Sequence, residues 1–258
     1  MSSQPDSHHV PMALYVHIPF CETKCPYCDF NTYAGIESLM PAYVGALRTE
    51  IADWGEVLDH PPLTTVFFGG GTPSYLPSRD IGDVLSSISA FDTANLTEVT
   101  LESNPGDLGP EKMAAFVATG VNRLSIGVQS FSDRLLGLLG RRHNAAEAVS
   151  AYRNAMAAGF SSVSIDLMYG LPHQSLQDWE QTLSATAGLE PPHISMYALT
   201  LEEGTPMERL VTEGKLPEQD GDLAADMYLA AEERLGALGY RHYEISNWAM
   251  PGHESAHN

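Results

Sequence analysis

Short apolar runs alternate with amphipathic segments along most of the chain. The runs are rich in β-branched and aromatic residues and are bounded by glycine, proline or polar residues, which is typical of buried strands. They predict strands at residues 14–18, 64–68, 98–103, 123–127, 162–167 and 193–199, with a further candidate at 240–245.

The segments between these runs carry apolar residues at helical spacing. They predict helices at residues 41–54, 81–90, 110–119, 144–158, 175–187 and 220–238. The apolar stripe of the first of these helices consists of Tyr43, Val44, Leu47, Ile51 and Trp54. Asn144 and Glu147 form a capping-box pattern at the start of the fourth helix, and Gly159 marks its end.

Six strands that alternate with helices indicate an α/β fold with a parallel sheet and right-handed crossovers. The order of elements is compatible with a doubly wound sheet or with a partial (β/α) barrel. In both architectures ligands bind at the carboxyl ends of the strands. We therefore expect the functional residues in the turns that follow the strands.

Composition narrows the class of protein. The 258 residues include 33 acidic and 13 basic side chains, a net charge of −20, which disfavours binding to nucleic acids and to anionic lipids. Residues 1–12 read as a flexible tail without the features of a secretory signal, and no apolar run is long enough for a transmembrane helix.

The three cysteines of the chain lie in one short segment with the spacing C-x3-C-x2-C: Cys21, Cys25 and Cys28. Three thiolates from one loop can bind three irons of a [4Fe–4S] cluster and leave the fourth iron open for a small molecule. The alternatives are a zinc site, for which His17 is the nearby fourth ligand, and cysteines that serve as small buried apolar residues. A cluster requires a reducing compartment, so we expect a cytoplasmic protein.

A glycine-rich turn, Gly69-Gly70-Gly71-Thr72-Pro73, follows the second predicted strand. Glycines let the backbone approach a ligand and expose its N–H groups, although the turn lacks the Gly-Lys-Ser/Thr of a Walker A loop. Glu102 lies near the end of the third predicted strand. Cysteines, glycines and Glu102 thus fall at the same predicted edge of the sheet.

Together, Tyr15, the cysteine triplet and the Gly-Gly-Gly-Thr-Pro turn resemble the radical S-adenosylmethionine (SAM) proteins. The resemblance is closest to the group related to oxygen-independent coproporphyrinogen III oxidase. It extends to residues 101–106, 122–131, 165–172 and 243–247, and covers the chain from about Leu14 to its last residue.

This resemblance implies a partial (β/α)6 barrel at residues 13–240, followed at 241–258 by the start of a C-terminal haem-chaperone region. It also implies SAM bound to the open iron, and one-electron cleavage of SAM to a 5′-deoxyadenosyl radical. The SAM contacts that it implies are Tyr15, Gly70, Gly71, Thr72, Glu102, Gln129, Arg141 and Asp166.

Two positions resemble the haem-chaperone (HemW-type) branch of the group. The oxidase branch has a further cysteine two positions after the third, where this chain has Phe30. His257 and Asn258 resemble the start of the branch's H-N-x-x-Y-W motif, whose histidine is implicated in haem binding. The resemblance implies haem as cargo, haem-accepting partners such as respiratory enzymes, a one-electron donor of the flavodoxin or ferredoxin type, and possible peripheral contact with the membrane.

Three functions remain open from the sequence: a haem chaperone, a radical enzyme that decarboxylates coproporphyrinogen, and a cluster-bearing chain without activity. The sequence stops inside the H-N-x-x-Y-W motif, so we expect residues 251–258 to lack supporting structure and to be disordered.

Overall fold

A computed structural model describes residues 10–258 of the chain, so most of the expected tail, residues 1–9, lies outside the described residues. Eight strands of the described part form one sheet in the order β1-β2-β3-β4-β5-β6-β8-β7. Strands β1 to β6 are parallel, β8 is antiparallel to β6, and β7 is antiparallel to β8. The strands are β1 (Met12–Ile18), β2 (Leu63–Gly70), β3 (Glu98–Ser103), β4 (Arg123–Gln129), β5 (Ser162–Tyr169), β6 (His193–Ala198), β7 (Arg241–Glu244) and β8 (Asn247–Ala249).

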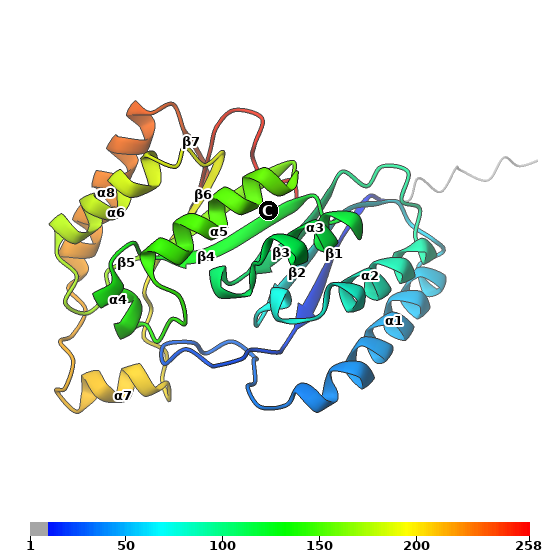
Figure 1. The fold of residues 1–258 in the computed structure, drawn as a ribbon, viewed down its shortest axis with the longest axis horizontal. Coiled ribbons are helices and arrows are strands. Elements are labelled where there is room, and N and C mark those ends of the chain that lie inside the picture. The colour runs from blue at the N-terminus through cyan, green and yellow to red at the C-terminus, as the bar shows by residue number, and fades with distance from the viewer. Residues whose placement is uncertain (1–9) are drawn as a thin grey trace, which may run out of the picture.

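Helices follow the parallel strands and cover one face of the sheet (Figure 1). Neighbouring helices pack side by side, α1 on α2, α2 on α3, α3 on α5 and α6 on α8. The helices are α1 (Met40–Val57), α2 (Ser78–Ser87), α3 (Pro110–Ala118), α4 (Asp133–Leu138), α5 (Ala145–Ala158), α6 (Leu176–Ala187), α7 (Pro206–Thr212) and α8 (Gly221–Ala237).

The predicted alternation of strands and helices is confirmed, including the capping box at Asn144 and Glu147. The prediction for α1 is wrong at Trp54, whose side chain is 53% exposed, because the helix turns this position toward solvent while Val44 and Ile51 are buried. The short elements α4, α7 and β8 were not predicted from the sequence.

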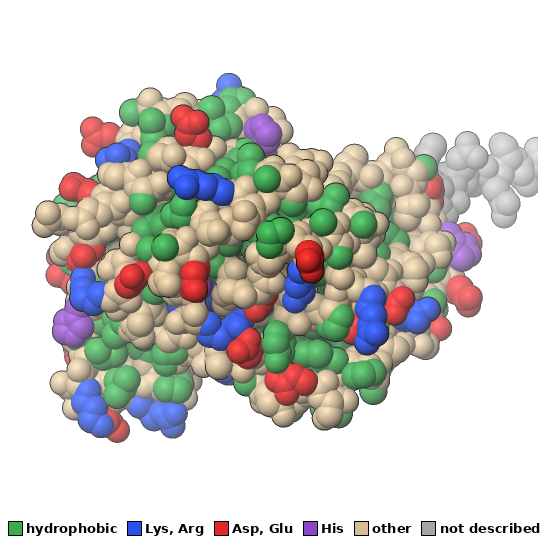
Figure 2. Space-filling view, viewed as in Figure 1, with side chains coloured by type: hydrophobic (Ala, Val, Ile, Leu, Met, Phe, Trp, Pro, Cys, Tyr) green, Lys and Arg blue, Asp and Glu red, His purple; other side chains and the backbone are tan. Residues whose placement is uncertain are grey.

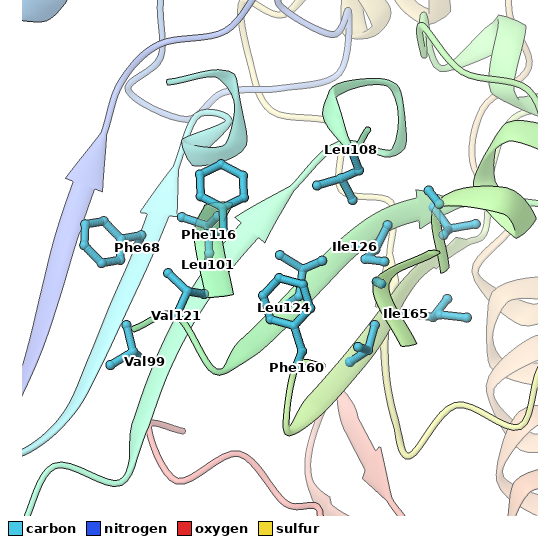
Figure 3. Close-up of a cluster of buried hydrophobic side chains, with 14 of the residues drawn as sticks. Phe68, Val99, Leu101, Leu108, Phe116, Val121, Leu124, Ile126, Phe160 and Ile165 are labelled. Carbon is cyan, nitrogen blue, oxygen red and sulfur yellow. The ribbon is translucent and has the colours of Figure 1, made fainter. Parts of the chain in front are cut away.

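The hydrophobic core lies between the sheet and the helices (Figure 3). Alternate side chains of the strands point into it, and they are almost fully buried: Val66 and Phe68, Val99 and Leu101, Leu124 and Ile126, Val163 and Ile165, and Ile194 and Met196. Phe116 from α3 and Phe160 from the turn before β5 complete the part of the core drawn in Figure 3. Apolar burial of this kind is the main contribution to the stability of the fold.

The intervening side chains of the same strands are polar. Successive side chains of a strand point to opposite faces, so these residues lie on the inner face of the sheet, away from the helices. The inner-face residues include Thr65 from β2, Glu98 and Thr100 from β3, Arg123 and Ser125 from β4, Ser164 and Asp166 from β5, and His193 and Ser195 from β6.

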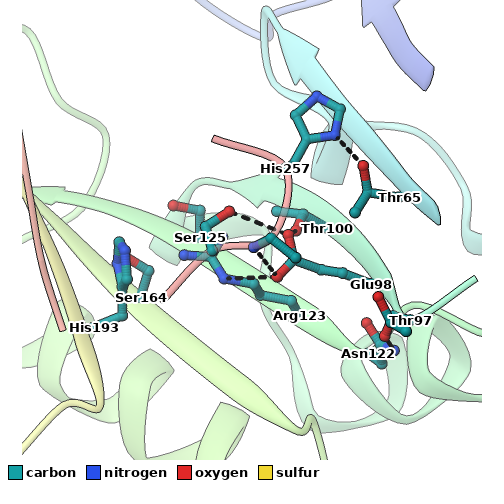
Figure 4. A network of polar contacts seen from close by, with 12 residues as sticks. Thr65, Thr97, Glu98, Thr100, Asn122, Arg123, Ser125, Ser164, His193 and His257 are labelled. Carbon is teal, nitrogen blue, oxygen red and sulfur yellow. Dashed lines mark hydrogen bonds and ion pairs between the residues drawn. The ribbon is translucent and has the colours of Figure 1, made fainter. Parts of the chain in front are cut away.

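Residues 255–258 pack against this inner face (Figure 4). The carboxylate of Glu98 accepts hydrogen bonds from the Ser255 hydroxyl (3.1 Å) and the Ala256 N–H (3.0 Å). The imidazole Nδ1 of His257 lies 2.9 Å from the Thr65 hydroxyl. The expectation of disorder for residues 251–258 is therefore wrong, because the polar inner face supplies hydrogen-bonding partners for this segment.

On the face covered by helices, acidic and basic side chains are interspersed with small apolar groups (Figure 2).

No helix within residues 10–258 combines the length and the apolar composition needed to cross a lipid bilayer.

Replacement of Leu124 by alanine tests the core. Its side chain is 0% exposed, so we expect Leu124→Ala to lower the free energy of unfolding by about 2–5 kcal/mol. Leu229→Ala in α8 is the matched control, because Leu229 is 62% exposed and its removal leaves no cavity. Chemical denaturation of both variants measures the difference. Equal destabilisation by the two replacements would contradict the assignment of the core.

Candidate functional site

A cavity of about 540 Å³ opens at the carboxyl ends of the parallel strands. It lies between the cysteine loop, the glycine-rich turn and the inner face of the sheet. Ten of the residues expected at the site line it: Cys21, Cys25, Cys28, Gly70, Gly71, Thr72, Glu102, Gln129, Arg141 and Asp166. The structure thus brings together residues that are widely separated along the chain.

The cysteine loop is held by hydrogen bonds and by apolar packing. The Cys21 N–H donates to the Tyr33 carbonyl (2.9 Å), and the Met207 N–H of α7 donates to the Pro26 carbonyl (2.9 Å). Tyr27 packs against a second apolar cluster, whose members are Leu135, Leu139, Met168, Leu171, Leu199 and Met207. Gly140 has a φ of 65°, and a Cβ at this position would come within 2.8 Å of the Pro26 ring.

The three thiols are unpaired, and two of them have hydrogen-bond donors beside them. The Thr72 hydroxyl lies 3.5 Å from the Cys21 sulfur, and an Nη of Arg141 lies 3.6 Å from the Cys25 sulfur. Donors of this kind stabilise thiolates, which are the ligands of iron–sulfur clusters. The donor set therefore fits a cluster with three protein ligands.

The arrangement around His17 does not favour the zinc alternative. The imidazole Nδ1 of His17 lies 3.3 Å from the Tyr15 hydroxyl, and its Nε2 lies 2.9 Å from the Asn31 carbonyl oxygen. Across the described residues, no group of three or more His, Cys, Asp and Glu side chains converges as the ligands of a single metal ion do. A cubane cluster needs no such convergence, because each cysteine binds a different iron.

The glycine-rich turn packs directly on the cysteine loop. The N–H groups of Gly71 and Thr72 donate to the carbonyls of Ile18 (2.8 Å) and Phe20 (2.9 Å). The Gly70 N–H donates to the Glu102 carboxylate (3.1 Å). The expectation that these N–H groups are exposed to a ligand is wrong, because the chain itself uses them. Glycine is required at Gly71 because a Cβ would lie 2.7 Å from the Phe20 carbonyl oxygen.

Two half-buried carboxyl groups, those of Glu102 and Asp166, lie in the wall of the cavity. Burial, together with the negative charge of Asp166, raises the pKa of Glu102 to about 7. Burial also raises the pKa of Asp166, although hydroxyl groups oppose this effect, chiefly that of Ser125 at 2.8 Å. Glu102 is therefore near the point at which a bound ligand decides its charge.

Gln129 and Arg141 meet where strand β4 ends. The register of β4 against β5 shifts between Gly127 and Gln129, and Gln129 has a φ of 67°, which is uncommon for a residue other than glycine. An Nη of Arg141 donates to the Gly127 carbonyl (2.7 Å). The Gln129 Oε1 and the Arg141 Nε are buried without a hydrogen-bond partner. Strained backbone and unsatisfied polar atoms of this kind are typical of binding sites.

The structure places Tyr15 and His257 outside the set of lining residues. Both pack on Phe67, which does line the cavity. The ring of Tyr15 stacks on that of Phe67 with their centroids 6.0 Å apart, and the centroid of the His257 imidazole lies 5.0 Å from that of the Phe67 ring. Asn258, the neighbour of His257, lines the cavity.

Several lining residues were missed from the sequence: Arg123, Ser125, Ser195, Tyr197 and Asn247. The signal that could have found them is the alternation of polar and apolar residues within the strands. Parallel strands covered on both faces by helices are apolar throughout, so regular polar positions indicate that one face lines a cavity.

This geometry agrees with the comparisons with known proteins. Residues 15–185 match the family described as the radical SAM superfamily. The chain belongs to this superfamily. Its cofactors are accordingly a [4Fe–4S] cluster and SAM.

The chain is also similar to individual proteins. The chain is 40% identical over 252 residues to "Heme chaperone HemW" of Mycobacterium tuberculosis, and 42% identical over 258 residues to mouse "Radical S-adenosyl methionine domain-containing protein 1, mitochondrial". These matches cover 96% and 98% of this chain, which spans 65% and 58% of the lengths of the two relatives.

Among solved structures, the chain is similar to the coproporphyrinogen III oxidase HemN of Escherichia coli, a radical SAM enzyme. The TM-score is 0.86 at 28% sequence identity, over 97% of this chain and 58% of the oxidase chain. The predicted α/β fold of the radical SAM type is thereby confirmed.

The protonation of Glu102 gives a testable dependence of stability on pH. Its pKa is about 7 in the native state against 4.5 as the reference value, so between these values the native state holds a proton that the unfolded state releases. The free energy of unfolding therefore falls as the pH rises through this window, by roughly 3 kcal/mol for this group.

Comparison with Glu102→Gln isolates this effect, because the amide does not titrate. In the protein without cofactors, we expect the wild type to lose stability relative to Glu102→Gln between pH 4.5 and about 7. Denaturation curves over this range give the difference. A difference that does not change with pH would show that Glu102 keeps its ordinary pKa.

Proposed function

We propose that this chain is the radical SAM core of a haem chaperone, which binds haem and delivers it to acceptor haemoproteins. The observation that carries the proposal is the 40% identity to a protein named as a haem chaperone, over 96% of this chain. Phe30 supports it, because it stands at the position where the oxidase branch has an additional cysteine.

Within this proposal, Cys21, Cys25 and Cys28 bind three irons of the cluster. When bound, the cluster and SAM supply a site for one-electron reduction and radical formation. Arg141 presents its guanidinium between the Cys25 sulfur and the Gly127 carbonyl, where it can pair with the carboxylate of SAM. Glu102 and Asp166 accept hydrogen bonds from hydroxyl or amino groups. At Gly70, Gly71 and Thr72, contacts with SAM would use carbonyl oxygens, since the N–H groups are already engaged.

The remaining SAM contacts in the proposal are Gln129 and Tyr15. Gln129 would use its Oε1, which has no hydrogen-bond partner, and Tyr15 would act through Phe67, the lining residue on which its ring stacks. The acceptor is a haem-binding protein such as a respiratory enzyme, and the electron donor is of the flavodoxin or ferredoxin type. The proposed compartment is the cytoplasm, with contact at the membrane surface where the acceptor is bound to it.

His257 is the proposed haem ligand. Burial lowers its pKa, which keeps the imidazole neutral and able to bind iron. Its Nδ1 lies 2.9 Å from the Thr65 hydroxyl, so its Nε2 is the nitrogen left for a metal.

Haem titration of the purified protein, followed by Soret absorbance, tests this assignment. We expect saturable binding that His257→Ala weakens at least tenfold, because the variant removes an axial iron ligand. The matched control is His253→Ala, an exposed histidine of the same segment, which we expect to bind haem as the wild type does. Unchanged binding in His257→Ala would reject His257 as the ligand, and the absence of saturable binding would reject the haem-chaperone proposal.

Loss of a proposed cluster ligand tests the cofactor site. After anaerobic reconstitution, we expect Cys28→Ser to retain much less iron and sulfide than the wild type and to lose reductive cleavage of SAM. Ser130→Ala, a replacement outside the cysteine loop, is the control. Equal iron content in Cys28→Ser and in the wild type would contradict the proposed ligand set.

Coproporphyrinogen oxidation is the second candidate function. The similarity to the Escherichia coli oxidase favours it, because the two folds agree with a TM-score of 0.86. Anaerobic incubation with reductant, SAM and coproporphyrinogen distinguishes the candidates. Formation of protoporphyrinogen would replace the chaperone proposal, whereas we expect none.

A further inference from the structure

A chain of hydrogen bonds, fully buried only between Ser164 and His193, crosses the inner face of the sheet from the cavity to its far edge. The Ser164 hydroxyl lies 2.7 Å from Nδ1 of His193 and 3.4 Å from the Asp166 carboxylate. The Nε2 of His193 lies 2.7 Å from the hydroxyl of Tyr243 in β7. Figure 4 shows Ser164 and His193 facing each other on this surface.

The two ends of this hydrogen-bond chain determine the direction in which its members donate. At the far end, the Tyr243 oxygen accepts the Ser255 N–H (3.1 Å), so its own proton is free to be donated to Nε2 of His193. His193 then carries its proton on Nδ1 and donates to Ser164, and Ser164 donates to the Asp166 carboxylate. Each member donates to the next, and the last acceptor is the Asp166 carboxyl group, whose ionised form such a chain stabilises.

His193 is 0% exposed, so it has no access to water that could replace either hydrogen bond. Burial, with the positive charge of Arg123, lowers its pKa to about 3, which keeps the ring neutral and able to donate at one nitrogen while accepting at the other. Donation in one direction along the hydrogen-bond chain requires that His193 be neutral and keep one tautomer.

We propose that Ser164, His193 and Tyr243 are positioning residues, which hold Asp166 ionised and oriented as a hydrogen-bond acceptor toward the ligand in the cavity. The proposal rests on the proposed function at one point, namely that Asp166 contacts SAM. It adds that three residues outside the expected SAM contacts determine whether Asp166 can accept from SAM.

Other groups also act on the charge of Asp166. Glu102 from β3 and Tyr197 from β6 interact with it electrostatically, Arg123 from β4 favours its ionised form, and the hydroxyls of Ser125 and Ser195 donate to it. The charge of His253, in the C-terminal segment, acts electrostatically on His193. Replacement of Ser164 leaves all of these groups in place, so Ser164→Ala isolates the hydrogen-bond chain.

The first test measures the pKa of Asp166 in the protein without cofactors. Infrared difference spectra between the wild type and Asp166→Asn, recorded against pH, report the protonation of this carboxyl group. Loss of a donor to a carboxylate raises its pKa, so we expect Ser164→Ala to shift the titration upward by about one pH unit. We expect Ser164→Thr to restore the original value, because threonine keeps the hydroxyl.

Ser162→Ala is the matched control. Ser162 lies two residues before Ser164 on the same face of the same strand, but its hydroxyl is buried without a hydrogen-bond partner. We expect no shift in this variant. An unshifted titration in Ser164→Ala, or equal shifts in Ser164→Ala and Ser162→Ala, would overturn the proposal.

The second test distinguishes a directed chain from a single hydrogen bond. Nitrogen-15 NMR at neutral pH identifies the tautomer of His193, and we expect the proton on Nδ1 in the wild type. In Tyr243→Phe the donor to Nε2 is gone, and we expect the proton to move in part to Nε2 and the Asp166 titration to shift upward as in Ser164→Ala. A proton on Nε2 in the wild type, or no change in Tyr243→Phe, would overturn the directed chain.

SAM binding separates failure of this inference from failure of the proposed function. By calorimetry on reconstituted protein, we expect Asp166→Asn to weaken binding at least tenfold, and Ser164→Ala to move the pH midpoint of binding upward by about one unit. If Asp166→Asn binds SAM normally, the assignment of Asp166 as a SAM contact is wrong. If Asp166→Asn weakens binding but Ser164→Ala leaves the midpoint unchanged, the positioning role is wrong and the SAM site stands.

Discussion

The alternation of side chains along the parallel strands is the constraint on which this structure depends. Each strand from β3 to β6 must supply apolar residues to the helix-covered face and polar residues to the cavity. Because the side-chain period of a strand is two, a slip of one residue would exchange the two sets. The same register that buries Ile165 in the core brings Asp166 to the cavity, opposite Gly127 of β4. Fold and site are therefore specified together.

The polar face creates an electrostatic environment that bulk water cannot provide. Glu102 and Asp166 line the cavity together with Arg123 and Arg141, and Glu98 is buried beside Arg123. Partial removal from water makes the charges of these groups depend strongly on one another. The negative charge of Glu98 is stabilised by the ion pair with Arg123 and by hydrogen bonds from residues 255 and 256. Glu102 accepts the Gly70 N–H, and Asp166 accepts serine hydroxyls, but neither forms an ion pair such as that of Glu98 within the described residues, so both retain the capacity to respond to a ligand that carries hydrogen-bond donors.

Sequence reasoning found most of the architecture because the strands are short apolar runs between long amphipathic helices. It also found ten residues that line the cavity, since the turns after parallel strands meet at one edge. It missed helices α4 and α7 because they are too short for a periodic stripe. For α7 a capping signal existed, Thr205 with Glu208 three residues later, and the structure shows that hydrogen bond. The disorder expected for residues 251–258 was wrong because partners such as Glu98 are distant in sequence and become neighbours only in the fold.

The way in which the cysteine loop is held has a consequence for how the protein matures. Its backbone bonds to Tyr33 and Met207, the packing of Tyr27, and the contact of Pro26 with Gly140 involve protein groups alone. In zinc fingers, by contrast, the metal is needed for the chain to fold. Here the loop that presents Cys21, Cys25 and Cys28 is built by the chain itself, so folding can precede the arrival of iron and sulfide. A cluster-assembly system can thus deliver its product to a polypeptide that has already folded.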